Sequence, residues 1–434
     1  MSWQLALAIY SVLLTATIVG GVAVGNAMGL VGIVGITMLG GTLLWPSLGD
    51  IVWNNVNSFT LTAVPLFVLM GEIILRSGAS RRFYEGIAVL TNRIPGRLAQ
   101  SNILACALFS AISGSSTATA LTIGTVALPE MRKRGYADSL TLGTLTGGGA
   151  LGNLIPPSIF LLVYAAVVQE SVIDLFVATI VPGIVAVIMF MGYVALRVLR
   201  DPTLAPPRAP RHDARRILRA VADCGPVSLL IVAIIGGMYW GVVTPTEAAG
   251  FGCMLALGLA FAYREMGPAS FYAALKSSVA VTCVVMFVIV NGQILSFAIV
   301  QSGIGRGLAG ALVDLGLAPF LFFTALFVFY LLLGTFLDGI SMMLLTVPVI
   351  HPALQAMGFD NVWFGVILVI QAELAQLSPP IGLNLFAVQS IARDVDLATI
   401  SRASLPYAIM LGILSFLLYA WPDMALGLVQ AMKG

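Results

Sequence analysis

The chain has 434 residues, of which 59% are hydrophobic and 9% carry a charge, and its formal net charge is only +2. This composition, with a mean hydropathy of +1.02, excludes a soluble globular protein, and the small net charge argues against a nucleic-acid partner. Apolar runs of roughly twenty residues recur along the chain and are continuous rather than alternating, which predicts an all-α polytopic membrane protein.

The first predicted unit covers residues 1–196. The apolar run that opens the chain has no basic leader, so we expect the first span there rather than a cleaved signal peptide. Further on, two arms of about fifteen residues fill 98–131. They are shorter than the ~20 residues a crossing helix needs, and both outer ends are basic, which predicts a re-entrant hairpin. Plain spans are expected near 5–25, 28–45, 59–75 and 172–196, with an interrupted span at 138–168.

A basic linker at 197–219 separates this unit from a second one at 220–434. The linker carries seven arginines, and we expect it on the cytoplasmic side of the membrane. In the second unit, plain spans are expected near 225–243, 245–263, 277–300 and 403–421, with a hairpin at 319–351 and an interrupted span at 361–391.

The two units share a skeleton of turn residues. Five residues of the first unit have a counterpart 223 positions later, namely Pro129 with Pro352, Gly135 with Gly358, Tyr136 with Phe359, Pro156 with Pro379, and Pro157 with Pro380. The constant offset predicts an internal duplication. With the linker inside, 19 of the 21 Lys and Arg residues lie on the cytoplasmic side and both termini are periplasmic. The second hairpin then enters from the opposite side, so the repeats are predicted to be inverted.

An inverted repeat with paired hairpins and broken helices predicts a secondary transporter that binds its cargo near the membrane midplane. Helix N-termini suit a carboxylate, whereas C-terminal carbonyls and neighbouring hydroxyls suit Na⁺. The alternative interpretation of Ser, Thr and Gly in a membrane helix is tight interhelical packing. Because the polar patch at Ser113–Thr119 falls at a hairpin tip and has a counterpart in the second unit, we favour an ion site.

Two other classes of protein are poorly supported. An ATP-driven pump is disfavoured because the sequence contains no Gly-Lys-Ser/Thr P-loop. An intramembrane enzyme would need a nucleophile with its base, or metal ligands. The two histidines, His212 and His351, lie in the linker and at the rim of the second hairpin, and no HExxH or GxSxG motif occurs.

Four motifs resemble the large membrane subunit of tripartite ATP-independent periplasmic (TRAP) transporters. They are GSSTAT (114–119), GGGALGNLIPPS (147–158), GTFLDG (334–339) and SPPIGLNLF (378–386), and the resemblance extends over nearly the whole chain. It implies a sodium-driven elevator with no cofactor other than Na⁺ as coupling ion. It also implies a small four-helix membrane subunit, a periplasmic solute-binding protein and a small organic acid as cargo. A stand-alone sodium–carboxylate symporter of the same architecture is the alternative.

The resemblance also implies where ions and cargo bind. The first sodium site would use Ser113, Gly114, Ser115, Ser116, Gly148 and Gly152. The second would use Thr335, Asp338, Gly339, Gln376, Ser378 and Pro379. Cargo would be held by helix N-termini with Thr117, Asn153, Pro156, Ser158 and Asn384. Where family members often have threonine before the second Pro-Pro, this chain has Ser378, which keeps the hydroxyl. Asp338 is followed by Gly339 rather than by the proline that is frequent there.

Three acidic residues within apolar sequence are further candidates. Asp338 could either ligate the cation or cap the second arm of its hairpin. Glu72 and Glu373 are interpreted as hydrogen-bonded structural carboxyls. No Lys or Arg lies within the predicted core segments to pair with the charge of the cargo.

Overall fold

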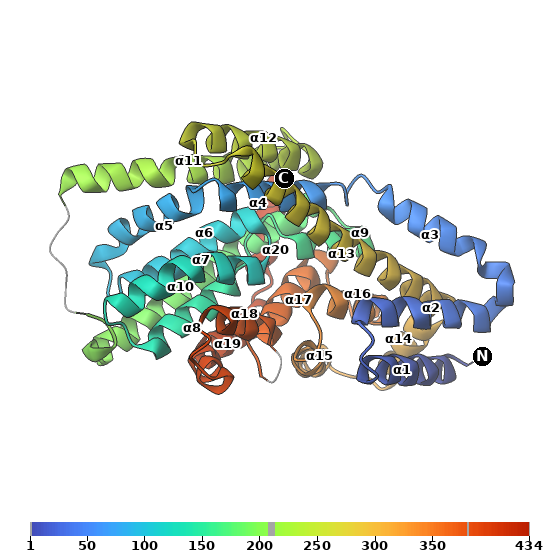
Figure 1. Ribbon diagram of the computed structural model, residues 1–434. Coiled ribbons are helices and arrows are strands. Elements are labelled where there is room, and N and C mark those ends of the chain that lie inside the picture. Colours follow the sequence, from blue (N-terminus) through green and yellow to red (C-terminus); the bar gives the residue numbers. More distant parts are fainter. Residues whose placement is uncertain (1, 207–212, 380–381, 434) are drawn as a thin grey trace.

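The computed structural model of the protein describes residues 2–206, 213–379 and 382–433. All regular secondary structure in these ranges is helical, and the helices form an elongated assembly (Figure 1). Seven of the described helices are long and apolar enough to cross a membrane, or eight if a bent pair counts as one span. The prediction of an all-α polytopic membrane protein is confirmed.

The helices of the first unit begin and end at the following residues: α1 Trp3–Val19, α2 Val24–Gly40, α3 Pro46–Val56, α4 Ala63–Arg76, α5 Ala79–Leu90, α6 Leu98–Ser113, α7 Ser116–Lys133, α8 Asp138–Gly149, α9 Ile159–Val168 and α10 Val172–Arg200. Helices α6 and α7 occupy the segment predicted as the first hairpin, and α8 and α9 are the two arms of the first interrupted span. The axes of α4 and α5 differ by 69°. Gly78 lies between them with φ of +75°, a left-handed conformation that glycine adopts readily.

The helices of the second unit are α11 Ala214–Tyr239, α12 Pro245–Tyr263, α13 Pro268–Gln301, α14 Ile304–Asp314, α15 Pro319–Gly334, α16 Gly339–Ala356, α17 Asn361–Gln376, α18 Leu383–Ile391, α19 Leu397–Ala420 and α20 Asp423–Lys433. Helices α15 and α16 occupy the second predicted hairpin, and α17 and α18 the second interrupted span. Helix α16 continues to Ala356, beyond the predicted end at 351, and contains both Pro348 and Pro352. At 18 residues it is long enough to cross a membrane by itself.

Helix boundaries recur at the offset that relates the five pairs of turn residues. Helix α7 spans 116–133 and α16 spans 339–356, so both of their ends are related by this offset. The same offset relates the first residues of α8 and α17, and the last residues of α9 and α18. The N-cap positions of α7 and α16, Ser115 and Asp338, are a further pair. The structural elements therefore follow the spacing of the turn residues.

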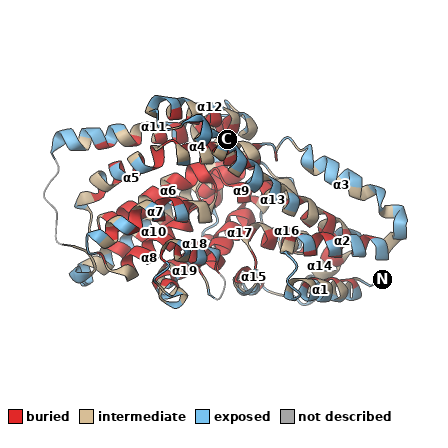
Figure 2. Ribbon diagram, viewed as in Figure 1, coloured by how far each residue is buried: buried red, intermediate tan, exposed pale blue. Residues whose placement is uncertain are grey.

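Two groups of helices meet at the hairpins. Helices α1, α2, α4, α11, α12 and α13 pack on one another, and hairpins and broken helices form a second group with α10 and α19. The groups touch where α4 meets α6 and where α13 meets α16. Buried residues concentrate in α6 to α10 and α17 (Figure 2). Helix α3 contains no buried residue, and no helix was predicted there from the sequence. The most enclosed part of the chain is thus the hairpin group.

Candidate functional site

The tip of the first hairpin consists of hydroxyl groups around one glycine. Helix α6 ends at Ser113, and Gly114 then adopts a left-handed conformation with φ of +56° before α7 begins. Ser113 Oγ lies 2.7 Å from Thr119 Oγ1, and Ser115 Oγ lies 3.4 Å from Thr117 Oγ1. The tip therefore places a C-terminus, an N-terminus and several neutral oxygens next to one another.

This tip is in direct backbone contact with the break between α8 and α9. A Cβ added to Gly152 would lie 2.3 Å from Ser116 Cα, and one added to Gly114 would lie 3.1 Å from the Pro157 carbonyl oxygen. Only glycine fits at Gly152 without displacing backbone. Gly148, predicted for the same ion site, instead faces the hairpin arm, where the Cys106 Sγ would lie 2.9 Å from an added Cβ.

Glu373 connects this first junction to the second broken helix. It lies in α17 and is fully buried. Ser116 Oγ donates to Glu373 Oε1 at 2.5 Å, and Asn153 Nδ2 donates to the same oxygen at 2.6 Å and to Ser116 Oγ at 3.0 Å. Gln376 Nε2 is a third donor to Oε1 at 3.5 Å. One carboxyl oxygen thus joins a hairpin tip to both broken helices.

The other oxygen of Glu373 has no such partner. Among the described residues, Oε2 is buried without any hydrogen-bond partner, and none of the ion pairs includes Glu373. A buried carboxylate without a counter-charge costs several kcal/mol. The site therefore requires a cation or a proton beside this oxygen.

The second junction is built differently. Asp338 Oδ1 caps α16 by accepting from the backbone N–H groups of Ile340 and Ser341 at 3.1 and 3.0 Å. The tip rests on α17, where Ala375 Cβ would lie 2.4 Å from a Cβ on Gly334. Of the two roles open to Asp338, capping is the one that the described contacts show.

The remaining residues predicted for the second sodium site are oriented mainly toward their own helices. Thr335 Oγ1 donates to the Leu332 carbonyl at 2.7 Å, and Ser378 Oγ donates to the Leu374 carbonyl at 2.9 Å. A Cβ on Gly339 would lie 3.3 Å from both Ala372 Cβ and Phe160 Cε2, and Pro379 is exposed. Pro380, which belongs to the predicted break, lies outside the described residues.

The residues predicted to hold cargo fall around the two breaks. Ser158 is buried and caps α9 by accepting from the Leu161 N–H at 3.4 Å, and Pro156 is buried beside it. Thr117 is half-buried in the first turn of α7. Asn384 lies in the first turn of α18 and is fully buried, and neither its amide nitrogen nor its amide oxygen has a partner among the described residues. These two unpaired atoms are available to a ligand.

The other acidic candidate, Glu72, lies on α4 next to Gly71, where an added Cβ would lie 3.3 Å from Ser113 Cα at the first hairpin tip. It forms an ion pair with Arg76 at 3.1 Å, and Ser277 Oγ donates to it at 2.7 Å. The ion pair lies within α4, the bond from Ser277 joins α4 to α13, and both agree with the interpretation of a hydrogen-bonded structural carboxyl.

Sequence reasoning placed Glu373 among structural carboxyls and missed its contact with Ser116, which is 257 residues away. The sequence nevertheless contained a signal for the polar contacts of Glu373. Asn153 and Gln376 are related by the same offset of 223 positions as the paired turn residues, so the predicted duplication would have placed an amide at the same position in each unit. Both amides donate to Glu373.

A helical membrane protein with two helical hairpins, two broken helices and a buried carboxyl at their junction has the architecture of a secondary transporter. Comparison with known families makes the assignment specific. The family described as "Tripartite ATP-independent periplasmic transporter, DctM component" matches residues 11–424. This chain belongs to that family of transporter permeases and is not an enzyme.

Individual relatives agree with the family match. The chain is 33% identical over 385 residues to the C4-dicarboxylate TRAP transporter large permease protein DctM of Pseudomonas aeruginosa, covering 88% of this chain and 89% of the relative. It is 31% identical to the sialic acid TRAP transporter large permease protein SiaM of Vibrio cholerae, with 88% of each chain covered. Its fold resembles the crystal structure of the YdaH transporter of Alcanivorax borkumensis, with a TM-score of 0.60, 14% identity, and coverage of 88% and 90% of the two chains.

Proposed function

We propose that this chain carries a small organic acid across the cytoplasmic membrane and couples its uptake to Na⁺. It would act with a small four-helix membrane subunit and with a periplasmic binding protein that delivers the cargo. Relatives named for C4-dicarboxylates and for sialic acid support an organic acid as cargo, and their naming as large permeases supports a smaller partner.

The observation that carries the sodium coupling is the environment of Glu373. Its carboxyl is fully buried, accepts three hydrogen bonds on one oxygen and, among the described residues, has no partner on the other. The carboxylate of Glu373 and the hydroxyl of Ser116 are oxygen ligands, which suit a hard cation, and in this proposal the C-terminal carbonyls of α6 add further oxygens. The first sodium site therefore includes Glu373 in addition to the residues of the hairpin tip.

Cargo binds between the two breaks in this proposal. Helices α7, α9, α16 and α18 all begin at a tip or a break, and their N-termini offer N–H groups to a carboxylate. The amide of Asn384, which has no partner among the described residues, adds a donor and an acceptor at the start of α18. No Lys or Arg occurs in 98–131, 138–196 or 307–392, so these dipoles and the bound Na⁺ compensate the charge of the cargo.

The transport cycle follows an elevator mechanism in this proposal. A duplication is supported by the recurrence of helix bounds at the constant offset between the two units, and its inversion by the distribution of Lys and Arg residues along the chain. The hairpins and broken helices move together as a mobile unit, against a scaffold formed by α1, α2, α4 and α11 to α13. The linker is cytoplasmic and both termini are periplasmic. The small subunit packs on the outer face of the scaffold, where α3 exposes Trp53 (68% exposed) and contains no buried residue.

Sodium binding can be tested on the purified full chain by thermal unfolding in NaCl, KCl and choline chloride. A cation that binds only the folded state stabilises it by RT ln(1 + [L]/Kd), about 2.7 kcal/mol at a hundredfold excess over Kd. We expect Na⁺ to raise the unfolding temperature of the wild type and of Glu72→Gln, but not that of Glu373→Gln. The Glu72 variant is a matched control because it alters a glutamate of the scaffold. Equal stabilisation by K⁺, or full stabilisation of Glu373→Gln by Na⁺, would contradict the proposed site.

Uptake of labelled succinate and sialic acid into proteoliposomes tests the transport function and its partners. With the small subunit and a binding protein present, we expect uptake that depends on an inward Na⁺ gradient and is lost in Glu373→Gln. Uptake by the large chain alone would favour the stand-alone symporter.

A further inference from the structure

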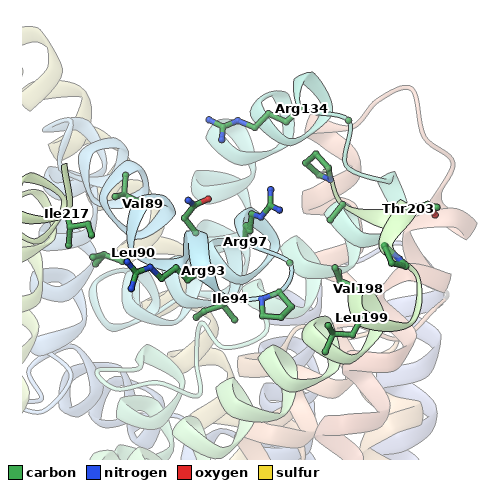
Figure 3. Close-up of a pocket in the computed structure, with 17 residues that line it drawn as sticks. Val89, Leu90, Arg93, Ile94, Arg97, Arg134, Val198, Leu199, Thr203 and Ile217 are labelled. Atoms are coloured by element: carbon green, nitrogen blue, oxygen red, sulfur yellow. The ribbon is translucent and has the colours of Figure 1, made fainter. Parts of the chain in front are cut away.

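A large crevice lies at the outer ends of the first hairpin, far from the tips. Its volume is about 1170 Å³, which exceeds the roughly 300–1,000 Å³ of ordinary small-molecule pockets. The walls come from the end of α5 and the turn before α6, from the turn after α7, from the end of α10 and from α11 (Figure 3). Both outer ends of the hairpin therefore contribute to it.

The crevice combines basic and apolar walls. Among the described residues that line it, Arg93, Arg97 and Arg134 are the charged ones and none is acidic. Val89, Leu90 and Ile217 lie on one side and Val198 and Leu199 on the other (Figure 3). Leu90 is 42% exposed and Leu199 63% exposed. A ligand that fits this lining has an anionic end and an apolar body.

A second cavity of about 1110 Å³ adjoins the first and shares Arg97 and Arg134 with it. It adds four arginines, one from α5 and three from α11, namely Arg81, Arg215, Arg216 and Arg219, against four acidic residues, Glu85, Glu130, Asp213 and Asp223. Arg134 is paired with Glu130, and Arg81 with Glu85. In the described part of the chain, Arg93, Arg215, Arg216 and Arg219 form no ion pair. The joined cavities retain an excess of positive charge.

We propose that this crevice binds an anionic phospholipid of the adjacent membrane leaflet. The phosphate lies among Arg93, Arg97 and Arg134, and an acyl chain follows the apolar wall at Leu90, Val198 and Leu199. Basic pockets between membrane helices commonly take such headgroups. A soluble phosphate would leave the exposed leucines in water, so a lipid uses more of the surface that the crevice presents.

The position of the crevice gives the lipid a role in transport, and this part rests on the proposed elevator. Arg97 precedes α6 and Arg134 follows α7, so two walls belong to the mobile unit, whereas Ile217 belongs to the scaffold helix α11. A bound lipid touches both parts and stabilises the arrangement seen in this structure. Movement of the hairpin would open the crevice and release the headgroup.

Lipid binding is tested on the purified full chain in a neutral detergent with fluorescent phosphatidylglycerol. We expect saturable binding that unlabelled phosphatidylglycerol displaces and that phosphatidylcholine and inorganic phosphate do not. Arg93→Gln and Arg134→Gln should each weaken binding about fivefold, the factor that corresponds to ~1 kcal/mol per basic residue near an anionic surface. Arg402→Gln is the matched control, because Arg402 is exposed and forms no ion pair in the described residues.

Three results would overturn the proposal: equal displacement by phosphatidylcholine, displacement by inorganic phosphate alone, or arginine variants that bind like Arg402→Gln. Should the variants not fold, the wild type still decides the question. Phosphatidylglycerol with a photoreactive acyl chain should label peptides that contain 89–94 or 198–199, and labelling confined to other segments would contradict the site. None of these measurements depends on Na⁺ or on transport, so they can fail independently of the proposed function.

Discussion

Replacing Gly152 with alanine adds one methyl group at the closest contact between the first tip and the first break. The new Cβ would lie 2.3 Å from Ser116 Cα and 2.5 Å from Ser116 N, where ordinary contacts begin at 3.4 Å. The break and the tip must therefore separate by about 1.1 Å, the difference between 3.4 and 2.3 Å. The obstacle is backbone, so rotation of a side chain cannot relieve it.

The expected cost follows from this geometry. Forcing a methyl group into a packed interior costs about 1–3 kcal/mol. If that cost falls on the sodium-bound arrangement, the Na⁺ concentration for half-maximal binding rises about 5- to 150-fold. We expect this shift because Ser116 carries a ligand hydroxyl of the proposed site and donates to Glu373.

The assay is Na⁺-dependent thermal stabilisation, followed by uptake into proteoliposomes. Gly258→Ala in α12 is the matched control, because a Cβ there meets nothing within 4 Å. Gel filtration must show that both variants are monodisperse. A Gly152→Ala protein that is folded and has wild-type sodium dependence would refute the assignment of this junction as an ion site.

Three further predictions address topology, movement and pH. The topology test uses a background in which Cys283 is replaced by alanine. A cysteine at Ala214 should react with impermeant maleimide only in opened membranes, whereas a cysteine at Gln355 should react in intact spheroplasts. Identical labelling at the two positions would exclude inverted repeats. Cysteines at Gly292→Cys and Leu344→Cys would have their Cβ atoms 2.8 Å apart, so α13 and α16 must separate slightly to reach the roughly 3.5–4.5 Å of a disulfide. The disulfide should arrest transport until it is reduced, and an unchanged transport rate in the crosslinked protein would exclude sliding of α13 past α16. A hydrogen bond from Arg132 lowers the pKa of Asp394. The stability that this bond adds is present above the pKa of about 4 that the carboxyl has in the unfolded chain. It is lost as the pH falls through the lower pKa of the folded protein. The unfolding temperature should then drop more steeply with acid in the wild type than in Arg132→Gln, and parallel curves would contradict this.

Local signals in the sequence predicted much of the architecture. Glycine and proline interrupt helices for steric reasons that do not depend on distant contacts, so the breaks and tips could be placed to within a few residues. The second hairpin was predicted to end at 351, but α16 accommodates Pro352 and continues to Ala356. A proline within a membrane helix is tolerated where neighbouring groups satisfy the freed carbonyl.

Contacts between distant segments could not be predicted in this way. The bond between Ser116 and Glu373 joins residues 257 positions apart and depends on how two broken helices cross. An ion pair of Lys433 with Asp174, at 2.5 Å, links helix α20 to α10. The hydrophobic periodicity of the sequence does not predict such a pair. The basic crevice likewise requires three helices and the turns at the hairpin ends to be assembled before its walls exist.

The helices proposed to move are joined to one another by polar bonds. At one end of the unit, Arg132 on α7 pairs with Asp394, which follows α18, at 3.0 Å. At the other end, Asn361 of α17 donates to Glu170 at 2.8 Å and lies 3.0 Å from His351 of α16. Together with the contacts of Glu373 in the middle, these bonds tie both hairpins to both broken helices.

At the boundary with the scaffold, the contacts of α4 with α6 and of α13 with α16 lack such polar bonds in the described residues. Gly71 of α4 faces the Ile112 carbonyl of α6, and Gly292 of α13 faces Leu344 of α16. In the described residues, no side-chain hydrogen bond is formed between α4 and α6 or between α13 and α16. Breaking a polar contact in the membrane interior costs several kcal/mol. Helices that contact each other through glycine can move past one another without leaving polar groups unpaired. Between α4 and α6, and between α13 and α16, the proposed movement therefore breaks no side-chain hydrogen bond among the described residues. In the proposed elevator, a rigid unit carrying Glu373 would cross the membrane along these contacts with the proposed ion ligands intact.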